Sequence, residues 1–567
     1  MACKGVPSMS ITPKKPNTLS SLALAIATIW SPSCFAMLAQ NMSVDLRSLS
    51  MGNAVTADPP GINAIHFNPA GLTKIKGLQL DVQLLMADFA IEADLSAPKG
   101  FNVFGYSDDP IVCADAPSNT DSLCSEFKTA HTEVAGVALY LPILDQVIKM
   151  PPGPITAPTA GIAYKPPGSK FTYANAFYAP MIAGYYREDN DPGVYMGKKV
   201  ALERITYLSP SVAYKVTDNL SVGLSVGMSY QAIALDTDFR APNELVGVFR
   251  LIDEDVCGPF KENANIVTDL ILFGACNANE SLGPFKKMAN MDLSLQQTLS
   301  PTYNLGILWE PNERFAWGAV YQSNAKMRMK GKYKITYEEG ARSLINDGLQ
   351  SSVTGQILGA ILGLPSYMPK EEKGLLSMNI EFPAHFQTGI KYKLLPNMQI
   401  NFDVGWTDFG QWKAFNFEFD RQIQVLKIAK ILVPNGGVTD TSLSFPLDFN
   451  TRWNWGIGME YTHTSRLKFR LGFEPRDSAV PDNKRNILAP INAAKMYSTG
   501  LSYRFDRDTD INLTLMHLVS RDTVPAGTST LLNQTGVTNL LYNPYAGLDA
   551  KTKAVINIMG LVYSTRW

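Results

Sequence analysis

The chain has 567 residues, of which 50 are Lys or Arg and 51 are Asp or Glu, so its formal net charge is −1. This balance excludes a protein that binds nucleic acid through a basic surface field. Charged residues make up 18% of the chain, below the ~25% of typical soluble domains, while the hydrophobic share is an ordinary 46%. The length allows several soluble domains or one large membrane barrel.

The first 36 residues have the pattern of a secretory signal peptide. Three lysines precede the apolar run 19–30, and Cys34-Phe35-Ala36 follows as a small-x-small cleavage site. The run is shorter than the ~20 apolar residues that a bilayer-spanning helix needs. We therefore expect residues 1–36 to be removed and the mature chain to begin near Met37. A lipoprotein cysteine at Cys34 is the alternative, which Pro32 disfavours.

Residues 37–76 show no alternation of apolar and polar positions. Small residues and Pro dominate in runs such as Ala57-Asp58-Pro59-Pro60-Gly61 and Asn68-Pro69-Ala70. Such a segment before the first strand is either a loose periplasmic tail or a plug inside the lumen, called the hatch below. A large barrel is wide enough to need filling or to conduct water.

Downstream of residue 77 the chain carries the alternation of a transmembrane β-barrel. In Leu220–Tyr230 every second residue is apolar and the others are Ser or Gly, so the strand has one apolar and one small polar face. A barrel strand turns such an apolar face, including Tyr230, toward lipid. We predict an all-β fold, a 14-stranded antiparallel barrel, with strands near residues 77–95, 156–165, 171–187, 199–215, 219–240, 289–309, 315–338, 377–394, 398–420, 449–463, 466–476, 493–505, 510–520 and 551–567. The number is even, as bacterial barrels require.

Proline interrupts several of these strands. Ala179-Pro180 falls within the third strand, where Pro180 cannot donate a hydrogen bond to its neighbour. The interruption is either an ordinary bulge or an opening in the wall. Pro210, Pro301 and Pro383 mark further bulges or breaks by the same argument.

The junctions between strands differ in length. Six are short and rich in turn residues, as in Pro311-Asn312-Glu313 and Asp506-Arg507-Asp508. The junctions near residues 96–155, 241–288, 339–376, 421–448 and 521–550 are long. Outer-membrane barrels have short periplasmic turns and long external loops, so this asymmetry predicts the orientation of the barrel.

Four cysteines lie in the predicted external loops. Cys113 is close in sequence to Cys124, and Cys257 to Cys276. Short loop closure and an oxidising compartment favour disulfides within these two local pairs, although four cysteines allow three connectivities. A zinc site is the alternative, disfavoured because there is no CxxC spacing and no nearby His. We expect no metal.

The loop at residues 341–376 carries apolar residues at helical spacing, which predicts a helix or a helix pair. It is either a loop packed over the barrel mouth or an apolar landing surface for a hydrophobic ligand. In the second interpretation the candidate ligand-binding residues are Leu358, Ile361 and Leu362. Val246, Phe249 and Leu251 of the 241–288 loop would form the other wall.

One motif suggests catalysis but fits the barrel better. Gly223-Leu224-Ser225-Val226-Gly227 matches the G-x-S-x-G pattern of serine hydrolases. That pattern needs a sharp turn from strand to helix, whereas Ser225 lies within unbroken alternation. The five histidines form no metal-binding pattern. We therefore expect no catalytic site and no cofactor.

The order of motifs resembles the FadL family of outer-membrane long-chain fatty-acid transporters. The resemblance lies in these residues: Ala54 and Ala57-Asp58, Asn63 to Asn68-Pro69-Ala70, Ala157-Pro158-Thr159-Ala160, Asp403-x-x-Trp406-x-x-Phe409, Phe469-Arg470-x-Gly472-Phe473, Asp477-Ser478-x-Val480-Pro481 and Arg485. The regions 96–155 and 341–376 depart from it. The terminal Trp567, on one face with Met559, Leu561 and Tyr563, resembles the signal read by the barrel assembly machinery.

The resemblance implies a barrel plugged by an N-terminal hatch at residues 37–76, with the barrel itself at 77–567. It implies that external loops catch the ligand and that a kink in the third strand lets it leave sideways into the bilayer. Asn68, Pro69, Ala70, Ala160, Ala179 and Pro180 are the expected hatch and lateral-gate residues. The expected function is passive uptake of long-chain fatty acids across the outer membrane of a Gram-negative bacterium, by a monomer in contact with outer-membrane lipid. Uptake of aromatic hydrocarbons is the alternative, and a lipid hydrolase or a general porin is disfavoured.

Overall fold

The computed structural model describes residues 41–99, 129–141, 146–150, 155–240, 257, 287–432, 437–488, 492–534 and 547–567. The predicted signal peptide lies outside the described residues, as do Cys113, Cys124 and Cys276. No helix in the described ranges is long and apolar enough to span a bilayer.

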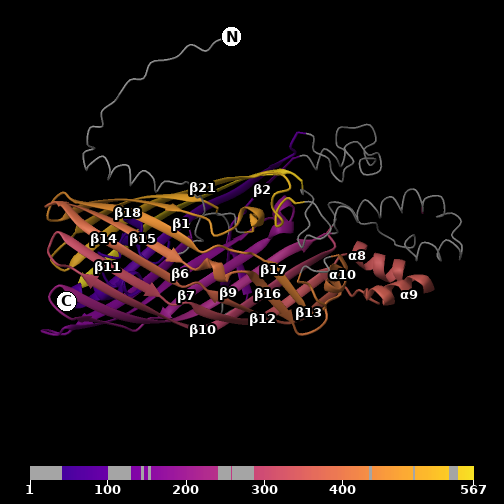
Figure 1. Cartoon of the computed structure of the whole chain (residues 1–567), viewed down its shortest axis with the longest axis horizontal. Coiled ribbons are helices and arrows are strands. Elements are labelled where there is room, and N and C mark those ends of the chain that lie inside the picture. The colour runs from indigo at the N-terminus through magenta and orange to yellow at the C-terminus, as the bar shows by residue number, and fades with distance from the viewer. Residues whose placement is uncertain are drawn as a thin grey trace, which may run out of the picture. The chain divides into compact units, whose positions relative to one another are not determined.

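The described strands form one closed antiparallel barrel of fourteen wall strands, as the sequence predicts (Figure 1). β1 pairs with β22 from Gln79–Arg566 to Ser96–Asp549, which closes the ring. Some wall strands are interrupted and carry two labels. In chain order they are β1 (Gly77–Ser96), β5 (Ile155–Lys165), β6 (Phe171–Tyr186), β7 (Lys199–Leu208) with β8 (Ser211–Lys215), β9 (Leu220–Phe239), β10 (Ala289–Trp309), β11 (Phe315–Gln322) with β12 (Ala325–Tyr337), β13 (Glu371–Phe382) with β14 (His385–Leu395), β15 (Met398–Thr407) with β16 (Ala414–Phe419), β17 (Ser442–Pro446) with β18 (Arg452–Thr462), β19 (Leu467–Arg476), β20 (Ala494–Arg504), β21 (Thr509–Val524) and β22 (Asp549–Arg566).

The two faces of β9 follow the predicted alternation over most of its length. Val222 and Leu224 are 37% and 39% exposed on the outer face, whereas Ser221 and Ser225 are buried on the lumen face. Tyr230 does not face lipid as expected. Tyr230 is only 6% exposed. The short strands Val137–Leu141 and Gln146–Met150, which lie in the chain between β1 and β5, pack over it on the outside of the wall.

The short turns are held by the residues that predicted them. The Asn312 side-chain oxygen accepts hydrogen bonds from the backbone N–H groups of Arg314 and Phe315, both at 2.9 Å. The Asp506 carboxylate does the same for Asp508 and Thr509 at 2.8 Å. Side-chain acceptors of this kind replace the backbone bonds that a tight turn lacks.

The breaks in the strands fall at the prolines. Pro210 separates β7 from β8, and Pro383 separates β13 from β14. Pro301 lies in β10 directly after a register shift between Gln297 and Ser300. Proline has no backbone N–H, so a break in the ladder at a proline leaves no unpaired donor at that residue.

Two regions that we expected to be loops contain strands. Residues 129–150 form β2 (Thr129–Glu133), β3 (Val137–Leu141) and β4 (Gln146–Met150), and β17 lies within the 421–448 region. β2 pairs with β1 from Ser96–Thr129 to Glu92–Glu133, beyond the point where β5 ends. Alternation alone did not identify these strands because each has only five residues.

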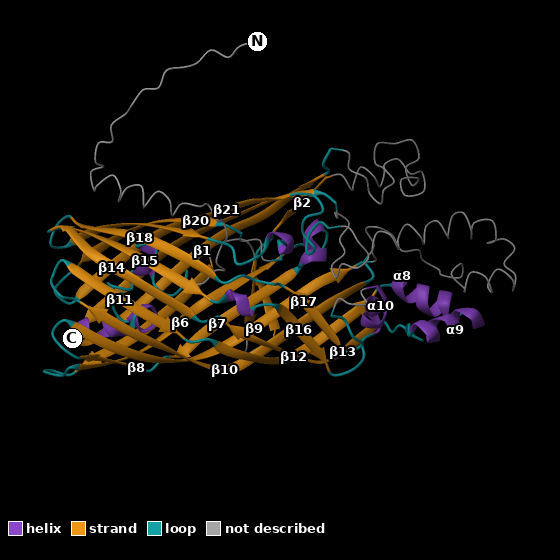
Figure 2. Ribbon diagram, in the orientation of Figure 1, coloured by secondary structure: helices purple, strands orange, loops and turns teal. Residues whose placement is uncertain are grey.

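Helices occupy the other external loops. The 339–376 region contains α8 (Glu339–Ser343), the π-helix η7 (Leu344–Leu349) and α9 (Val353–Leu362), and the next long loop contains α10 (Gln424–Leu432). Figure 2 shows α8, α9 and α10 together beyond one end of the strands, opposite the end where the chain terminates. They therefore lie at the external end of the barrel, away from the short turns.

The N-terminal segment is folded as a hatch of short helices, α2 (Leu46–Ser50), α3 (Ala64–Phe67) and the 3-10 helix η1 (Pro69–Lys74). Its apolar side chains, including Val44, Ile62 and Leu72, form a buried cluster with lumen-facing wall residues such as Ala176 and Tyr178. The segment is therefore a plug inside the barrel and not a loose tail.

Candidate functional site

The hatch is held in the lumen by side chains of the wall that bind its backbone. The donors come from strands all round the barrel: Thr514 to Leu46 O, Asn304 to Ile65 O, Gln322 to His66 O, Asn401 to Ala54 O and Gln387 to Asn53 O, at 2.7–3.1 Å. Irregular backbone is tolerated at membrane depth only where protein satisfies its polar groups. These bonds therefore fix the hatch in place.

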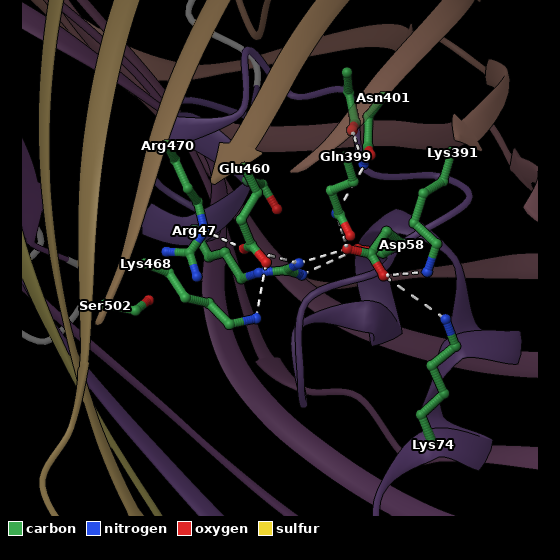
Figure 3. A network of polar contacts seen from close by, with 12 residues as sticks. Arg47, Asp58, Lys74, Lys391, Gln399, Asn401, Glu460, Lys468, Arg470 and Ser502 are labelled. Carbon is green, nitrogen blue, oxygen red and sulfur yellow. Dashed lines mark hydrogen bonds and ion pairs between the residues drawn. The ribbon is translucent and has the colours of Figure 1, made fainter. Parts of the chain in front are cut away.

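An ion-pair network joins the hatch to the short-turn end of the wall (Figure 3). Asp58 of the hatch lies 2.6 Å from the Arg47 guanidinium and 3.0 Å from the Lys391 ammonium of β14. Gln399 of β15 also donates to Asp58, at 3.0 Å. Arg47 in turn lies 3.8 Å from Glu460 of β18. The hatch is thus anchored by opposite charges on two wall strands, β14 and β18, and by a neutral donor on β15.

The charge state of Asp58 follows from this setting. Asp58 belongs to the hatch and not to a membrane-spanning strand. Burial alone would raise the pKa of its carboxyl group, but the positive charges of Arg47, Lys391 and Lys74 lower that pKa well below its usual range. Asp58 therefore stays ionised, and the network stays intact, throughout the neutral pH range.

Glycines of the wall make room for the hatch. Gly456 of β18 and Gly472 of β19 face Gly52, and a Cβ at either position would overlap the Gly52 backbone. Gly52 itself has φ +61°, a conformation that favours glycine. Gly223 faces Pro69 in the same way, so hatch packing accounts for one glycine of the G-x-S-x-G sequence.

The hatch and gate residues expected from the sequence lie at two places. Asn68 donates to Thr56 O at 2.8 Å and to Ile307 O of β10 at 2.9 Å, and Pro69 and Ala70 lie against β9. Ala179 and Pro180 instead contact the start of the described hatch. Ser43 Oγ donates to Ala179 O at 2.7 Å, and Asn41 N donates to Pro180 O at 3.1 Å.

The wall is incompletely paired beside Pro180. Among the described residues, β5 and β6 pair only from Tyr164–Tyr173 to Ala160–Phe177. Between the pairs Tyr178–Thr206 and Met181–Arg204, β6 contains one residue more than β7, so Ala179-Pro180 forms a bulge. Pairing on this side resumes only where Gly136 bridges Tyr186. We call the stretch of β6 from Tyr178 to Tyr185 the unpaired seam.

The lumen beside the unpaired seam is apolar. Ala183 of β6 packs against a buried cluster that joins the hatch to the nearby wall strands β1, β22, β21 and β20. Its other members include Met42, Leu85, Met496, Met516, Leu518 and Ile558. An apolar molecule in this part of the lumen would therefore meet hydrocarbon surface up to the seam.

A second apolar region lies at the external end of the lumen. A groove there has about 1090 Å³ of space between atoms, part of it open to solvent. Aliphatic side chains of β7, β9 and β10 form one side, with Leu202, Ile233 and Met291 among them. Aromatic side chains of the 409–449 region form the other: Trp412, Phe415, Phe417, Phe445 and Phe449. Apolar walls of this kind suit a hydrophobic ligand.

The ligand-binding residues proposed from the sequence do not line this groove. Leu358, Ile361 and Leu362 lie on α9, where Ile361 is 75% exposed. Val246, Phe249 and Leu251 lie outside the described residues. The alternating run Phe415-x-Phe417-x-Phe419 is the sequence signal for the groove, but alternation alone predicts an ordinary barrel strand. A role for α9 in capturing ligand stays a prediction.

Three buried polar side chains of the lumen lack hydrogen-bond partners at some or all of their polar atoms. Arg204 of β7 and Gln231 of β9 are paired neighbours, and Ser300 follows on β10. Among the described residues, Arg204 Nη1, both polar atoms of the Gln231 amide and Ser300 Oγ have no partner. Arg204 donates to Thr302 at 3.2 Å and lies over the Phe382 ring, with no carboxylate within 4.0 Å in the described ranges. We call these three residues the polar cluster.

One predicted disulfide residue can be assessed. Cys257 is buried and disulfide-bonded. Its expected partner Cys276, and the pair Cys113 and Cys124, lie outside the described residues, so the two local pairings stay predictions.

A closed fourteen-strand barrel with a hatch bound inside it and an apolar external lumen defines an outer-membrane barrel of the plugged class. The chain belongs to the family described as "Outer membrane protein transport protein (OMPP1/FadL/TodX)", whose model matches residues 23–567. It is therefore a FadL-type protein of the Gram-negative outer membrane, as its sequence motifs indicated.

Curated relatives match part of the chain. A long-chain fatty acid transport protein of Escherichia coli O6:H1 is 27% identical over 218 residues, which are 38% of this chain and 42% of the relative. The 47 kDa outer membrane protein of Pasteurella multocida is 26% identical over 218 residues, with the same two shares. The chain thus spans about two fifths of the length of these relatives.

Solved structures share the fold over most of the chain. A FadL homologue of Pseudomonas aeruginosa superposes with a TM-score of 0.60 at 15% identity, covering 94% of this chain and 100% of the other. The toluene transporter TodX of P. putida superposes with a TM-score of 0.55 at 13% identity, covering 92% and 99%.

Proposed function

We propose that this protein takes up long-chain fatty acids by passive diffusion, from the external groove through the apolar lumen and out through the unpaired seam. Each stage of this route is supported by a separate feature: the aromatic groove, the polar cluster and the bulge at Pro180. The hatch closes the alternative route along the barrel axis.

Three further expectations stay predictions. They are that the terminal Trp567 is read as an assembly signal, that the barrel contacts outer-membrane lipid, and that the protein is a monomer.

The physical cost of a wet pore favours a sideways route. Moving a ~16-carbon chain from hydrocarbon into water costs about 12 kcal/mol, at ~0.8 kcal/mol per CH₂. A path that keeps the chain on apolar surface avoids most of this barrier. The cluster around Leu85, Met516 and Ala183 supplies such a surface between the lumen and β6.

The bulge at Ala179-Pro180 gives the seam a structural origin. Beyond the bulge β6 follows β7, and among the described residues its other edge has no β5 partner. The two bulge carbonyls are bound from inside by Ser43 and Asn41 of the hatch. Movement of the hatch start would therefore free the backbone at the seam, which couples the hatch to the proposed exit.

The polar cluster is the single observation that favours a fatty acid as the ligand. A buried guanidinium without a counter-ion is costly, and an ionisable group at membrane depth marks a functional site. A carboxylate can accept hydrogen bonds from Arg204, the Gln231 amide and the Ser300 hydroxyl together. The aliphatic Leu202 of β7 lines the groove two residues away. The arrangement thus suits an anionic head joined to an apolar tail.

Uptake of aromatic hydrocarbons is the second candidate function. The five aromatic side chains of the groove support it, because aromatic rings stack favourably on aromatic surfaces. TodX and the other toluene transporters share the fold. A neutral hydrocarbon gives the polar cluster no counter-ion, so we rank this candidate second. We also propose transport without catalysis, in preference to a lipid hydrolase, and rank a general porin below both because a porin needs no apolar groove.

The test replaces the charge of Arg204 and measures two ligands. In purified Arg204→Met protein we expect the affinity for oleate to fall about 10- to 100-fold, because hydrogen bonds to charged groups contribute about 1.5–3 kcal/mol. The affinity for toluene should not change. Arg204→Lys, which keeps the charge, is the matched control and should retain part of the oleate affinity. Unchanged oleate binding by Arg204→Met, or an equal loss for toluene, would contradict the assignment.

A further inference from the structure

The outer face of β12 carries a row of five basic side chains. The odd-numbered residues of β12, such as Met327, Met329 and Tyr333, are buried in the lumen cluster, so the even-numbered residues point outward. The outward positions in sequence order are Lys326, Arg328, Lys330, Lys332 and Lys334, all exposed. We call these five residues the basic row. Neither the hatch nor the ligand route uses it.

The basic row begins where the apolar belt of the barrel ends. On the neighbouring strand β10 the outward side chains from Trp309 through Leu305 to Leu299 are apolar and exposed. Ten residues at ~3.3 Å, tilted by ~40°, give a belt about 25 Å tall, the height expected for the hydrocarbon core. Arg328 N donates to Gln297 Oε1 at 2.7 Å, which places the row directly beyond Leu299 on the external side.

The lower part of the row faces few counter-charges: among its partners on β13, the one carboxylate is Glu381, which pairs in register with Lys326. Lys326, Arg328 and Lys330 have no carboxylate within 4.0 Å among the described residues, whereas Lys334 lies 2.9 Å from Glu371. On the facing strand β13 the partners of Arg328 and Lys330 are Asn379 and Ser377, which are uncharged. The chain as a whole has a net charge of −1, so this surplus is local and not a consequence of composition.

The outer face elsewhere at the same end is of mixed sign. Beside β22, Lys553 lies 2.6 Å from Glu92 of β1. Asp94 and Glu133 lie on the adjoining strands, where both contact His131. Opposite charges at the membrane boundary neutralise one another there, whereas Arg328 and Lys330 of β12 have no carboxylate within 4.0 Å among the described residues.

We propose that the basic row binds the phosphate groups of the phosphorylated glycolipid, lipopolysaccharide, that forms the outer leaflet around the barrel. Lys326, Arg328 and Lys330 lie at the level of the lipid headgroups, and successive members are about 7 Å apart along the strand. Lys and Arg side chains reach such phosphates as charge-assisted hydrogen-bond donors. The low dielectric of the adjoining hydrocarbon strengthens each contact.

The test counts lipopolysaccharide molecules bound to the purified full-length protein by native mass spectrometry. The variant K326Q/R328Q/K330Q removes three positive charges from the row and leaves the lumen unchanged. The matched control K495Q/R521Q/K551Q removes three exposed positive charges from the outer face of β20, β21 and β22. Lipopolysaccharide whose phosphates have been removed enzymatically, and phosphatidylglycerol, are the comparison lipids. The folding of each variant is checked by comparing the electrophoretic mobility of heated and unheated samples, which differ when the barrel is folded.

We expect the row variant to lose at least about fivefold of the bound lipopolysaccharide and the control variant to keep it. Dephosphorylated lipopolysaccharide should bind the unmodified protein no better than native lipopolysaccharide binds the row variant. Equal retention by the row variant and the unmodified protein would overturn the proposal. An equal loss in the control variant, or equal binding of phosphatidylglycerol, would overturn it as well, because either result would reduce the row to a nonspecific attraction for anionic lipid.

Discussion

The barrel holds a hatch in its lumen and, among the described residues, is incompletely paired at its side, and the two regions are built differently. On the axis, hydrogen bonds from strands all round the wall hold the backbone of the hatch, and the Asp58 network adds opposite charges. At the side, the β5–β6 pairing ends at Ala160–Phe177 among the described residues. In contrast, β1 and β22 pair along the whole of β22.

The difference shows which path each region can serve. Water and ions need a polar, continuous path, and the hatch occupies the axis where that path would run. An apolar chain needs a path lined with hydrocarbon, and the cluster beside Ala183 leads to the seam. Missing ladder bonds weaken the wall at the seam, because backbone groups there have no strand partner among the described residues.

The largest effect is expected from removing the axial closure. Deleting residues 37–70 should raise ion conductance in planar bilayers from near background to that of an open channel, because a fourteen-strand barrel without filling is wide enough for water. Deleting residues 353–362, which form the external helix α9, is the control and should leave conductance low. Low conductance after the hatch deletion would mean that the hatch does not close the axis.

A smaller effect is expected from Asp58→Asn, which loosens the hatch without removing it. Loss of the carboxylate leaves Arg47 and Lys391 without their shared partner and should weaken docking by about 3 kcal/mol. We expect more frequent open events in single-channel recordings and faster hydrogen exchange in the hatch. Gln399→Ala removes one neutral donor to Asp58 and should have a lesser effect.

The pH dependence of the same contact has a definite sign. The folded-state pKa of Asp58 is lowered, so its contribution to docking is present above the unfolded value of about 3.9 and is lost as the pH falls through the folded value. The unmodified channel should therefore stay closed from pH 8 to about pH 4. Opening between pH 7 and pH 5 would show that another group controls the hatch.

Much of the wall could be predicted from the sequence because its signals are local. Alternation placed the wall strands to within a few residues for most of them, and turn residues such as Asn312 and Asp506 marked the short junctions. Pro180 marked the bulge, since a residue without an N–H cannot continue a ladder.

The remaining features depend on contacts distant in sequence. The pairing of β2 with β1, and the hairpin that covers Tyr230, require knowledge of where β5 ends. The polar cluster unites three strands whose residues look unremarkable alone, and only the folded structure shows that Arg204 is buried with no carboxylate within 4.0 Å in the described part of the chain. The groove was missed because its phenylalanines alternate like any barrel strand.

The most direct test of the lateral exit is the deletion of Pro180. Because Tyr178 and Met181 both face the lumen, removing one residue between them restores regular pairing and keeps every other side chain on its own face. Deleting Leu394 removes the register shift at the end of β14, away from the seam and the polar cluster, and is the matched control. We predict that the Pro180 deletion abolishes most uptake of radiolabelled oleate by cells while the protein still folds and the Leu394 deletion transports normally. Normal oleate uptake by the Pro180 deletion would contradict a sideways exit at this seam.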